Sequence, residues 1–322
     1  MIIGIGLLLL GLIMLAFFSD KTIDVAARLA ATANIPPLLI GIIVLSMGTS
    51  LPEISTSITS TLSGHPEINV GDIFGSSLSQ ITLILGLSVL LAGPIKEGRR
   101  DVLLLGGCAI IAAMLSLFVV EGGSISTLDA VFLIVAYFIL IFISNKYTVK
   151  EYAAPEGTEA KKFWPWRDRI LGSGKLLLFL AGVVVGAILV VNSTIEISTE
   201  LGIDPYLISF FGIALGTSLP ELFVCMAAIR RGQDELAIGN ILGSNITDTT
   251  LALASGPLIV PSLLPEAGLA IAVQTGTYMV IASIFVVILF AWRKKLDRAA
   301  ALALLGAYAL SYFFLFSSGI IG

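Results

Sequence analysis

The sequence has 322 residues, of which 57% are hydrophobic and only 12% are charged, and its formal net charge is −4. Soluble proteins carry about 25% charged residues, so half that share cannot cover the surface of a soluble globule of this size. This composition excludes a cytosolic enzyme and a nucleic-acid-binding protein. The two cysteines, Cys108 and Cys225, both lie in apolar runs, which excludes a secreted disulfide scaffold. The sequence therefore predicts an integral membrane protein that crosses the bilayer several times.

Apolar stretches follow one another along the whole chain, and a transmembrane helix needs about 20 mostly apolar residues. We expect ten spans, at approximately 2–18, 36–62, 68–92, 102–120, 125–144, 174–193, 205–229, 236–262, 267–292 and 299–320. The N-terminal run has no basic residues before it and no small-residue cleavage site after it, so it is interpreted as the first span rather than as a signal peptide. The expected organisation is a first five-helix repeat at 1–144, a polar cytoplasmic loop at 145–173, and a second five-helix repeat at 174–322.

Positively charged residues occur in only some of the expected connections. All 18 Lys and Arg residues lie in or at the edge of the connections after spans one, three, five, seven and nine, and the remaining connections and both ends have none. Cytoplasmic loops of membrane proteins carry an excess of Lys and Arg. The distribution therefore predicts a protein of the cell membrane with a cytoplasmic central loop and with both termini outside.

Two polar motifs occur twice in the sequence. The string Gly-Thr-Ser-Leu-Pro-Glu stands at 48–53 and again at 216–221, and Gly-Asp-Ile-Phe-Gly-Ser at 71–76 corresponds to Gly-Asn-Ile-Leu-Gly-Ser at 239–244. Both pairs have the same offset in the numbering, so they indicate an internal duplication. Because each repeat has five spans, the second one would enter the membrane from the opposite face, which predicts inverted repeats.

The duplicated hexapeptide is expected near the middle of the bilayer in both copies. Gly48 follows Pro36 by 12 residues, and Gly216 follows Asp204 by 12 residues. At 1.5 Å per residue, both motifs would begin about 18 Å into a hydrocarbon core of about 30 Å. Two copies of one polar motif that meet at the midplane from opposite sides are typical of secondary transporters with discontinuous helices.

Glu53 and Glu221 end the two hexapeptides and place carboxylates near the bilayer centre. An ionised carboxylate is costly there unless it is paired, and no Lys or Arg is expected at that depth, so a bound cation or a proton must supply the positive charge. Each motif adds Thr and Ser hydroxyls and a proline that frees a backbone carbonyl. Farther along, Asp248 adds a third carboxylate, and Gln80, its counterpart in the first repeat, adds an amide oxygen. An all-oxygen set suits Ca²⁺ and other hard cations better than zinc or copper.

The paired GTSLPE strings, followed by GxxxGSxxxQ and GxxxGSxxxD, resemble the alpha repeats of the calcium/cation antiporter superfamily, nearest to its sodium/calcium exchanger branch. The resemblance extends over the whole chain. It implies an all-α membrane fold of ten transmembrane helices in two inverted five-helix repeats, with discontinuous helices at the midplane. It implies cation-binding side chains at Glu53, Glu221, Thr49, Ser50, Thr217, Ser218, Ser76, Ser244 and Asp248, and backbone oxygen ligands at Ser46 and Ala214. The pattern departs at Gln80, where prokaryotic sodium/calcium exchangers usually have Asn.

Several further polar residues allow two interpretations. Asp72 lies early in span three, opposite Asn240 in the repeat, and could either start a helix or line an ion entrance. The Ser/Thr run at 55–63 could line a permeation path or form hydrogen bonds between helices. His65 is expected at the surface, in a short outside loop.

The predicted function is the exchange of cytoplasmic Ca²⁺ for external Na⁺ by alternating access, with both ions as transported substrates and without an organic cofactor. A Ca²⁺/H⁺ antiporter of the same superfamily is the alternative. A channel is disfavoured because channels usually build their filter on the symmetry axis of an oligomer. An enzyme is disfavoured because the sequence has no GxSxG, HExxH or Walker A string. The expected partners are the lipid bilayer and cations, without nucleic acid or an obligate protein partner.

Overall fold

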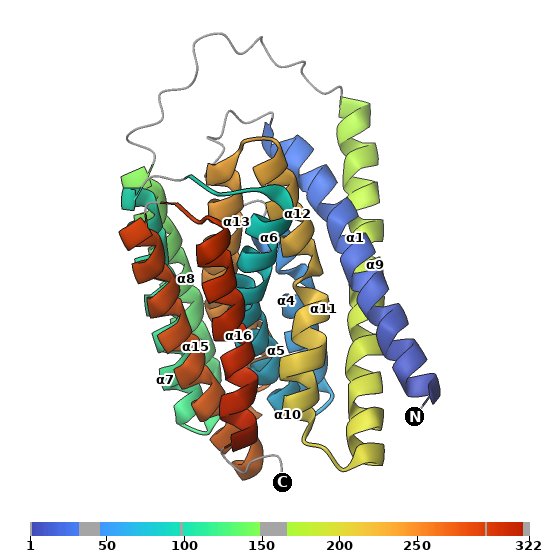
Figure 1. Ribbon diagram of the computed structural model, residues 1–322. Helices are drawn as coiled ribbons and strands as arrows, with labels where there is room; N and C mark the ends of the chain where they lie inside the picture. Colours follow the sequence, from blue (N-terminus) through green and yellow to red (C-terminus); the bar gives the residue numbers. More distant parts are fainter. Residues whose placement is uncertain (1, 32–45, 97–98, 149–165, 294, 318–322) are drawn as a thin grey trace.

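The computed structural model is a bundle of long helices, described here for residues 2–31, 46–96, 99–148, 166–293 and 295–317 (Figure 1). Within these residues, six helices are long and apolar enough to cross a membrane. Large apolar side chains cover the outside of the bundle, and Phe118 and Phe142 are 72% and 65% exposed. Such a surface suits lipid rather than water. The expectation of an all-α integral membrane protein is therefore confirmed.

The first half of the chain begins with one long helix and continues with several shorter segments. Its helices are α1 (Ile2–Ala31), α3 (Ser46–Thr49), α4 (Leu51–Leu62), α5 (Pro66–Ser79), the π-helical turn η2 (Gln80–Ile84), α6 (Leu85–Ala92), α7 (Arg99–Glu121) and α8 (Thr127–Thr148).

The second half also begins with one long helix and continues with shorter segments. Its helices are α9 (Trp166–Leu201), α10 (Pro205–Ile208), the π-helical turn η4 (Ser209–Ile213), α11 (Ala214–Thr217), α12 (Leu219–Arg230), α13 (Asp234–Thr247), the π-helical turn η5 (Asp248–Ala252), α14 (Leu253–Ile259), α15 (Glu266–Arg293) and α16 (Arg298–Ser317).

The elements that carry the duplicated motifs recur at the spacing of the sequence repeat. Helices α3, α4 and α5 and the turn η2 correspond to α11, α12, α13 and η5, respectively, with the same offset between their first residues, and each pair has equal length. A π-helical turn is rare and often lies at a functional site. Here one begins at Gln80 and its counterpart begins at Asp248, so both copies change their helical register at this pair of candidate site residues.

Two expected spans are longer helices than the sequence indicated. The first span was expected to end at residue 18, but α1 continues to Ala31, and the sixth was expected at 174–193, but α9 extends from Trp166 to Leu201. Polar residues mark where a helix leaves the lipid, but backbone hydrogen bonds continue into water where good helix formers follow, as in the alanine-rich end of α1. The expected start of the second span, 36–45, and most of the central loop lie outside the described residues.

Short pairings join the connections between helices at the ends of the bundle. Ile95 pairs with Leu296, and the Lys96 N–H donates to Asp234 Oδ2 at 2.8 Å. Elsewhere, β1 (Ser124–Ile125) pairs antiparallel with β2 (Ser262–Leu263). These pairings were not predicted from the sequence, because each joins a connection of the first repeat to a distant connection of the second.

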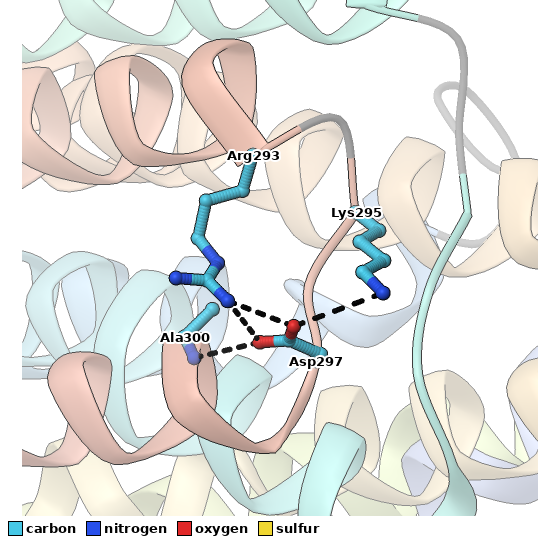
Figure 2. Close-up of polar contacts among 4 residues, drawn as sticks. All are labelled: Arg293, Lys295, Asp297 and Ala300. Atoms are coloured by element: carbon cyan, nitrogen blue, oxygen red, sulfur yellow. Dashed lines mark hydrogen bonds and ion pairs between the residues drawn. The ribbon is translucent and has the colours of Figure 1, made fainter.

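Asp297 caps the start of α16 and is held by the end of α15 (Figure 2). The Arg293 guanidinium donates to both of its carboxylate oxygens, at 2.8 and 3.1 Å, and the Ala300 N–H donates at 3.1 Å. The Lys295 ammonium lies 4.0 Å away. The hydrogen bonds from Arg293 and Ala300 hold the pKa of the Asp297 carboxyl below its usual value. This cluster fixes the turn between the last two helices.

Helices α1 and α9 form a pair at one side of the bundle (Figure 1). They cross where two glycines meet, and a Cβ atom added at Gly11 would lie only 2.9 Å from the Gly186 carbonyl. An apolar cluster separate from the main core joins the pair to the other helices, where Leu15 of α1 lies in one cluster with Ile68 of α5 and Ile213 of η4. The pair is thus joined to the bundle by its own small hydrophobic seam.

Candidate ion-binding site

Both GTSLPE motifs interrupt a helix in the same way. Between α3 and α4, Ser50 has φ −79° and ψ 5°, and between α11 and α12, Ser218 has φ −83° and ψ 3°. Two residues later, Pro52 and Pro220 lack an N–H, so the carbonyl one turn before each proline loses its usual donor. The carboxylates of Glu53 and Glu221 follow directly, in the first turn of the next helix.

Two equivalent clusters of oxygen atoms form where the repeats meet. In the first, the Thr217 hydroxyl lies 3.1 Å from the Ser76 hydroxyl, and the Ala214 carbonyl lies 3.3 and 3.4 Å from the two hydroxyls. We call these three residues the Thr217 half-site. They come from α11 in one repeat and α5 in the other.

The second cluster repeats this arrangement with the equivalent residues of the opposite repeats. The Thr49 hydroxyl lies 3.0 Å from the Ser244 hydroxyl and 3.3 Å from the Ser46 carbonyl. We call Thr49, Ser244 and Ser46 the Thr49 half-site. Each half-site thus needs both repeats, because its hydroxyls stand on helices from opposite halves of the chain.

Small residues allow the backbones to approach closely enough for these contacts. A Cβ atom at Gly71 would lie 2.6 Å from the Tyr206 carbonyl. One at Gly75 would meet the Phe210 carbonyl and lie 2.7 Å from Ala214 Cβ. A larger side chain at either position would push α5 away from η4 and α11, and Ser76 would no longer reach Thr217.

Four carboxylates surround the two half-sites. Glu53, Glu221, Asp248 and Asp72 have no exposed surface. Neither oxygen of Glu53 or Glu221 has a hydrogen bond of normal geometry, although the Thr49 and Ser244 hydroxyls approach Glu221. The carboxylate of Glu53 is close enough to the other three acids to be repelled by their charge. Buried charges without a partner are costly, so this region is built to receive positive charge.

Gln80 and Asp248 face each other although they are equivalent positions of the two repeats. The Gln80 amide nitrogen donates to Asp248 Oδ2 at 2.8 Å, and the Gln80 oxygen accepts from the Asn245 amide at 2.9 Å. Asp248 Oδ1 has no hydrogen bond of normal geometry, and the Ser50 hydroxyl approaches this carboxylate. The amide oxygen of Gln80 is thus engaged by Asn245, while its nitrogen orients Asp248.

All twelve residues predicted to bind cations are completely buried. Ser218 contacts Ser79, whose hydroxyl lies 3.4 Å away. Within the described residues, no three Asp, Glu, His or Cys side chains converge closely enough to hold a metal ion by themselves. A hard cation at this place would therefore also need the hydroxyl and carbonyl oxygens of the half-sites, which is the ligand type that Ca²⁺ and similar ions take.

The Ser/Thr run at 55–63 and His65 were the other polar residues whose roles the sequence had indicated. Ser57, within the Ser/Thr run, accepts a hydrogen bond from the Gly256 N–H at 3.1 Å and so joins α4 to α14. Thr56 and Thr61 are buried with unpartnered hydroxyls. His65 is less exposed than expected, at 34% of its side chain, because its ring lies 2.9 Å from the Glu67 carboxylate.

Asn245 was not predicted as a site residue from the sequence, and Asp72 had two possible roles. Asn245 lies three residues before Asp248 and therefore on the same helix face, which is the one signal that could have indicated its contact with Gln80. Asp72 precedes Ser76 by four residues, and its Oδ1 accepts from Ser76 and from Thr217. It stands in the described site rather than at the start of a helix.

These observations define the class of the protein. It is an all-α membrane protein whose buried site of acidic and other oxygen ligands occurs in two equivalent copies. The sodium/calcium exchanger protein family matches this chain over residues 3–146 and 172–317. The chain therefore belongs to this family of calcium/cation antiporters, and the resemblance noted in the sequence is confirmed.

Individual relatives agree with this assignment. An uncharacterized membrane protein of Methanocaldococcus jannaschii is 34% identical over 313 residues, which are 97% of each chain. The sodium/calcium exchanger MaX1 of Methanosarcina acetivorans is 28% identical over 299 residues, which are 82% of this chain and 85% of the relative. The solved structure of the sodium-calcium exchanger NCX_Mj is similar with a TM-score of 0.61 and 32% identity, over 97% of this chain and 98% of that chain.

Proposed function

We propose that this protein exchanges Ca²⁺ for Na⁺ across the cell membrane by alternating access. The observation that carries the proposal is the pair of equivalent half-sites, which place unpartnered buried carboxylates beside hydroxyl and carbonyl oxygens. Hydroxyls and carbonyls can ligate Na⁺ or Ca²⁺ but contribute nothing to a site that only holds protons. The donor set therefore favours sodium over protons as the coupling ion.

The charge of the site explains why the exchange would be coupled. Glu53, Glu221 and Asp248 together carry three negative charges when ionised. One Ca²⁺ leaves about one negative charge over, whereas three Na⁺ balance all three. Because both kinds of ion need the same carboxylates, they cannot be bound together, and each ion leaves only when the other replaces it. Eleven of the twelve predicted cation ligands take this role in the proposal, and the twelfth, Gln80, orients Asp248.

The proposed topology has ten spans in two inverted repeats, at 1–144 and 174–322, joined by a cytoplasmic loop at 145–173. Two connections that contain basic residues lie together, since Ile95 pairs with Leu296. Two connections without Lys or Arg lie together through β1 and β2. The start of α1 and the end of α16 lie at the same end of the bundle (Figure 1), as two termini outside the cell require.

The α1–α9 pair is the element that we propose to move. It is joined to the bundle by its own apolar seam, and apolar contacts are non-directional, so a sliding displacement replaces one set of such contacts with another. The seam borders both half-sites, because α1 contacts α3 and α11. A displacement of this pair would open the ions to one side of the membrane and close them to the other.

Calcium flux into sealed vesicles tests the function. Purified protein in liposomes should take up radioactive Ca²⁺ when an outward Na⁺ gradient is imposed, and uptake should stop when Na⁺ is equal on both sides or is replaced by K⁺. Liposomes without protein and an imposed pH gradient without Na⁺ are the controls. Uptake that follows the pH gradient and ignores Na⁺ would refute sodium coupling and support the Ca²⁺/H⁺ alternative, and uptake without any counter-ion would indicate a channel.

A further inference from the structure

Asp72 makes the two half-sites chemically unequal. It stands on α5, four residues and so about one helical turn before Ser76. Its Oδ1 accepts from Thr217 at 3.0 Å and from Ser76 at 3.4 Å, whereas its Oδ2 is buried without a partner. The equivalent position of the other repeat is Asn240, which is also completely buried, and neither polar atom of its side chain has a partner.

We propose that Asp72 is a further cation ligand, which binds a transported hard cation at the Thr217 half-site and gives this half-site one more negative charge than the Thr49 half-site. This inference rests on the proposed function. The free Oδ2 is an oxygen available to an ion. A hydroxyl that donates its hydrogen to Asp72 also keeps its lone pairs for a cation, so Asp72 turns the oxygens of Thr217 and Ser76 into ligands.

The alternative role for Asp72 is to tie α5 to α11 by hydrogen bonds alone. An asparagine would accept the same two hydrogen bonds through its amide oxygen, and it would avoid the cost of a buried charge without a partner. At the equivalent position Asn240 makes no hydrogen bond with its side chain, and yet the Thr49 and Ser244 hydroxyls of that half-site still meet at 3.0 Å, so the contact between the repeats forms without this side chain. The negative charge of Asp72 is therefore explained by a bound cation and not by the contact between α5 and α11.

The consequence is an ordered pair of subsites. Asp248 is close enough to repel both Glu53 and Glu221, so its charge acts on both half-sites, whereas Asp72 adds its charge beside Glu53. At the Thr49 half-site, Glu221 has the neutral Asn240 instead. A cation therefore binds first, and more tightly, at the Thr217 half-site than at the Thr49 half-site.

The test exchanges the acid and the amide between the repeats. Asp72→Asn, Asn240→Asp and the double exchange are compared with the unchanged protein, and Glu121→Gln removes an exposed carboxylate at the end of α7 as the matched control. Two quantities are measured on each purified protein: the Kd for radioactive Ca²⁺, with Na⁺ as competitor, and the rise in Tm that each ion produces. Binding to the native state alone raises apparent stability, so the second measurement reports occupancy independently.

Asp72→Asn should weaken Ca²⁺ binding at least about tenfold and reduce the ion-dependent rise in Tm, without lowering the Tm in the absence of ions. The double exchange should recover most of the lost affinity, because it moves the acid to the equivalent half-site. Equal Kd values for Asp72→Asn and the unchanged protein would overturn the inference. So would a lower ion-free Tm with an undiminished ion response, which is the result of a purely structural role. If the unchanged protein binds neither Ca²⁺ nor Na⁺, the proposed function itself is wrong.

Discussion

Replacing Glu53 or Glu221 with glutamine removes one negative charge from the site and keeps the shape of the side chain. Both residues are completely buried, and no oxygen of either has a hydrogen bond of normal geometry. The ion-free fold therefore gains little from these charges beyond the approach of the Thr49 and Ser244 hydroxyls to Glu221. We expect the two variants to fold with an ion-free Tm that is no lower than that of the unchanged protein, and to lose Ca²⁺ transport.

The magnitude follows from the burial of the two acids. A unit charge and a divalent ion 4 Å apart attract by about 8 kcal/mol at an effective dielectric constant of about 20. Dehydration of the ion and of the carboxylate offsets much of this attraction. A net loss of about 3 kcal/mol corresponds to a Kd at least about a hundredfold higher. Each substitution removes one carboxylate from the site, so each should raise the Kd by at least this factor.

The assay combines flux and binding. Sodium-driven Ca²⁺ uptake by Glu53→Gln or Glu221→Gln in liposomes should fall to the level of empty vesicles, while Glu121→Gln should keep the normal rate. Calcium titration of the purified variants then separates lost binding from lost movement. Substantial sodium-driven uptake by either variant would refute the site assignment, and a variant that binds Ca²⁺ normally but does not transport it would refute the electrostatic reasoning.

Two further predictions concern topology and packing. With both native cysteines buried, an impermeant thiol reagent should label Ser63→Cys only from outside intact cells and Gln233→Cys only from the cytoplasmic face; the reverse pattern would invert the proposed orientation. Gly75→Ala should destabilise the protein by about 1–3 kcal/mol, because the new methyl group would meet Phe210. Gly306→Ala has open space around it and should leave the Tm unchanged or slightly higher, so equal Tm values for both would contradict the packing argument.

The sequence alone determined those features that depend on local composition and on repetition. Apolar stretches predicted a helical membrane protein because the backbone in lipid must form its own hydrogen bonds, in helices or closed barrels, and runs of about 20 apolar residues suit helices. The duplication at one constant offset predicted which elements would be alike, and α4, α5 and η2 do recur at that spacing. The GTSLPE strings and the GxxxGS motifs that follow them indicated the family, because these motifs resemble its alpha repeats specifically. The ends of helices were less accurate, because α1 and α9 continue beyond their apolar parts.

Only the tertiary structure decided which atoms of the two repeats meet. Gln80 was expected to offer its amide oxygen, but that oxygen is engaged by Asn245, and the amide nitrogen contacts Asp248. Asp72 could not be assigned from its position because its partner Thr217 lies 145 residues away in sequence. The direction of a side chain depends on neighbours that the fold brings together, and these neighbours belong to the opposite repeat. The local sequence identifies the candidate ligands, whereas the packing of one repeat against the other determines the orientation of their side chains.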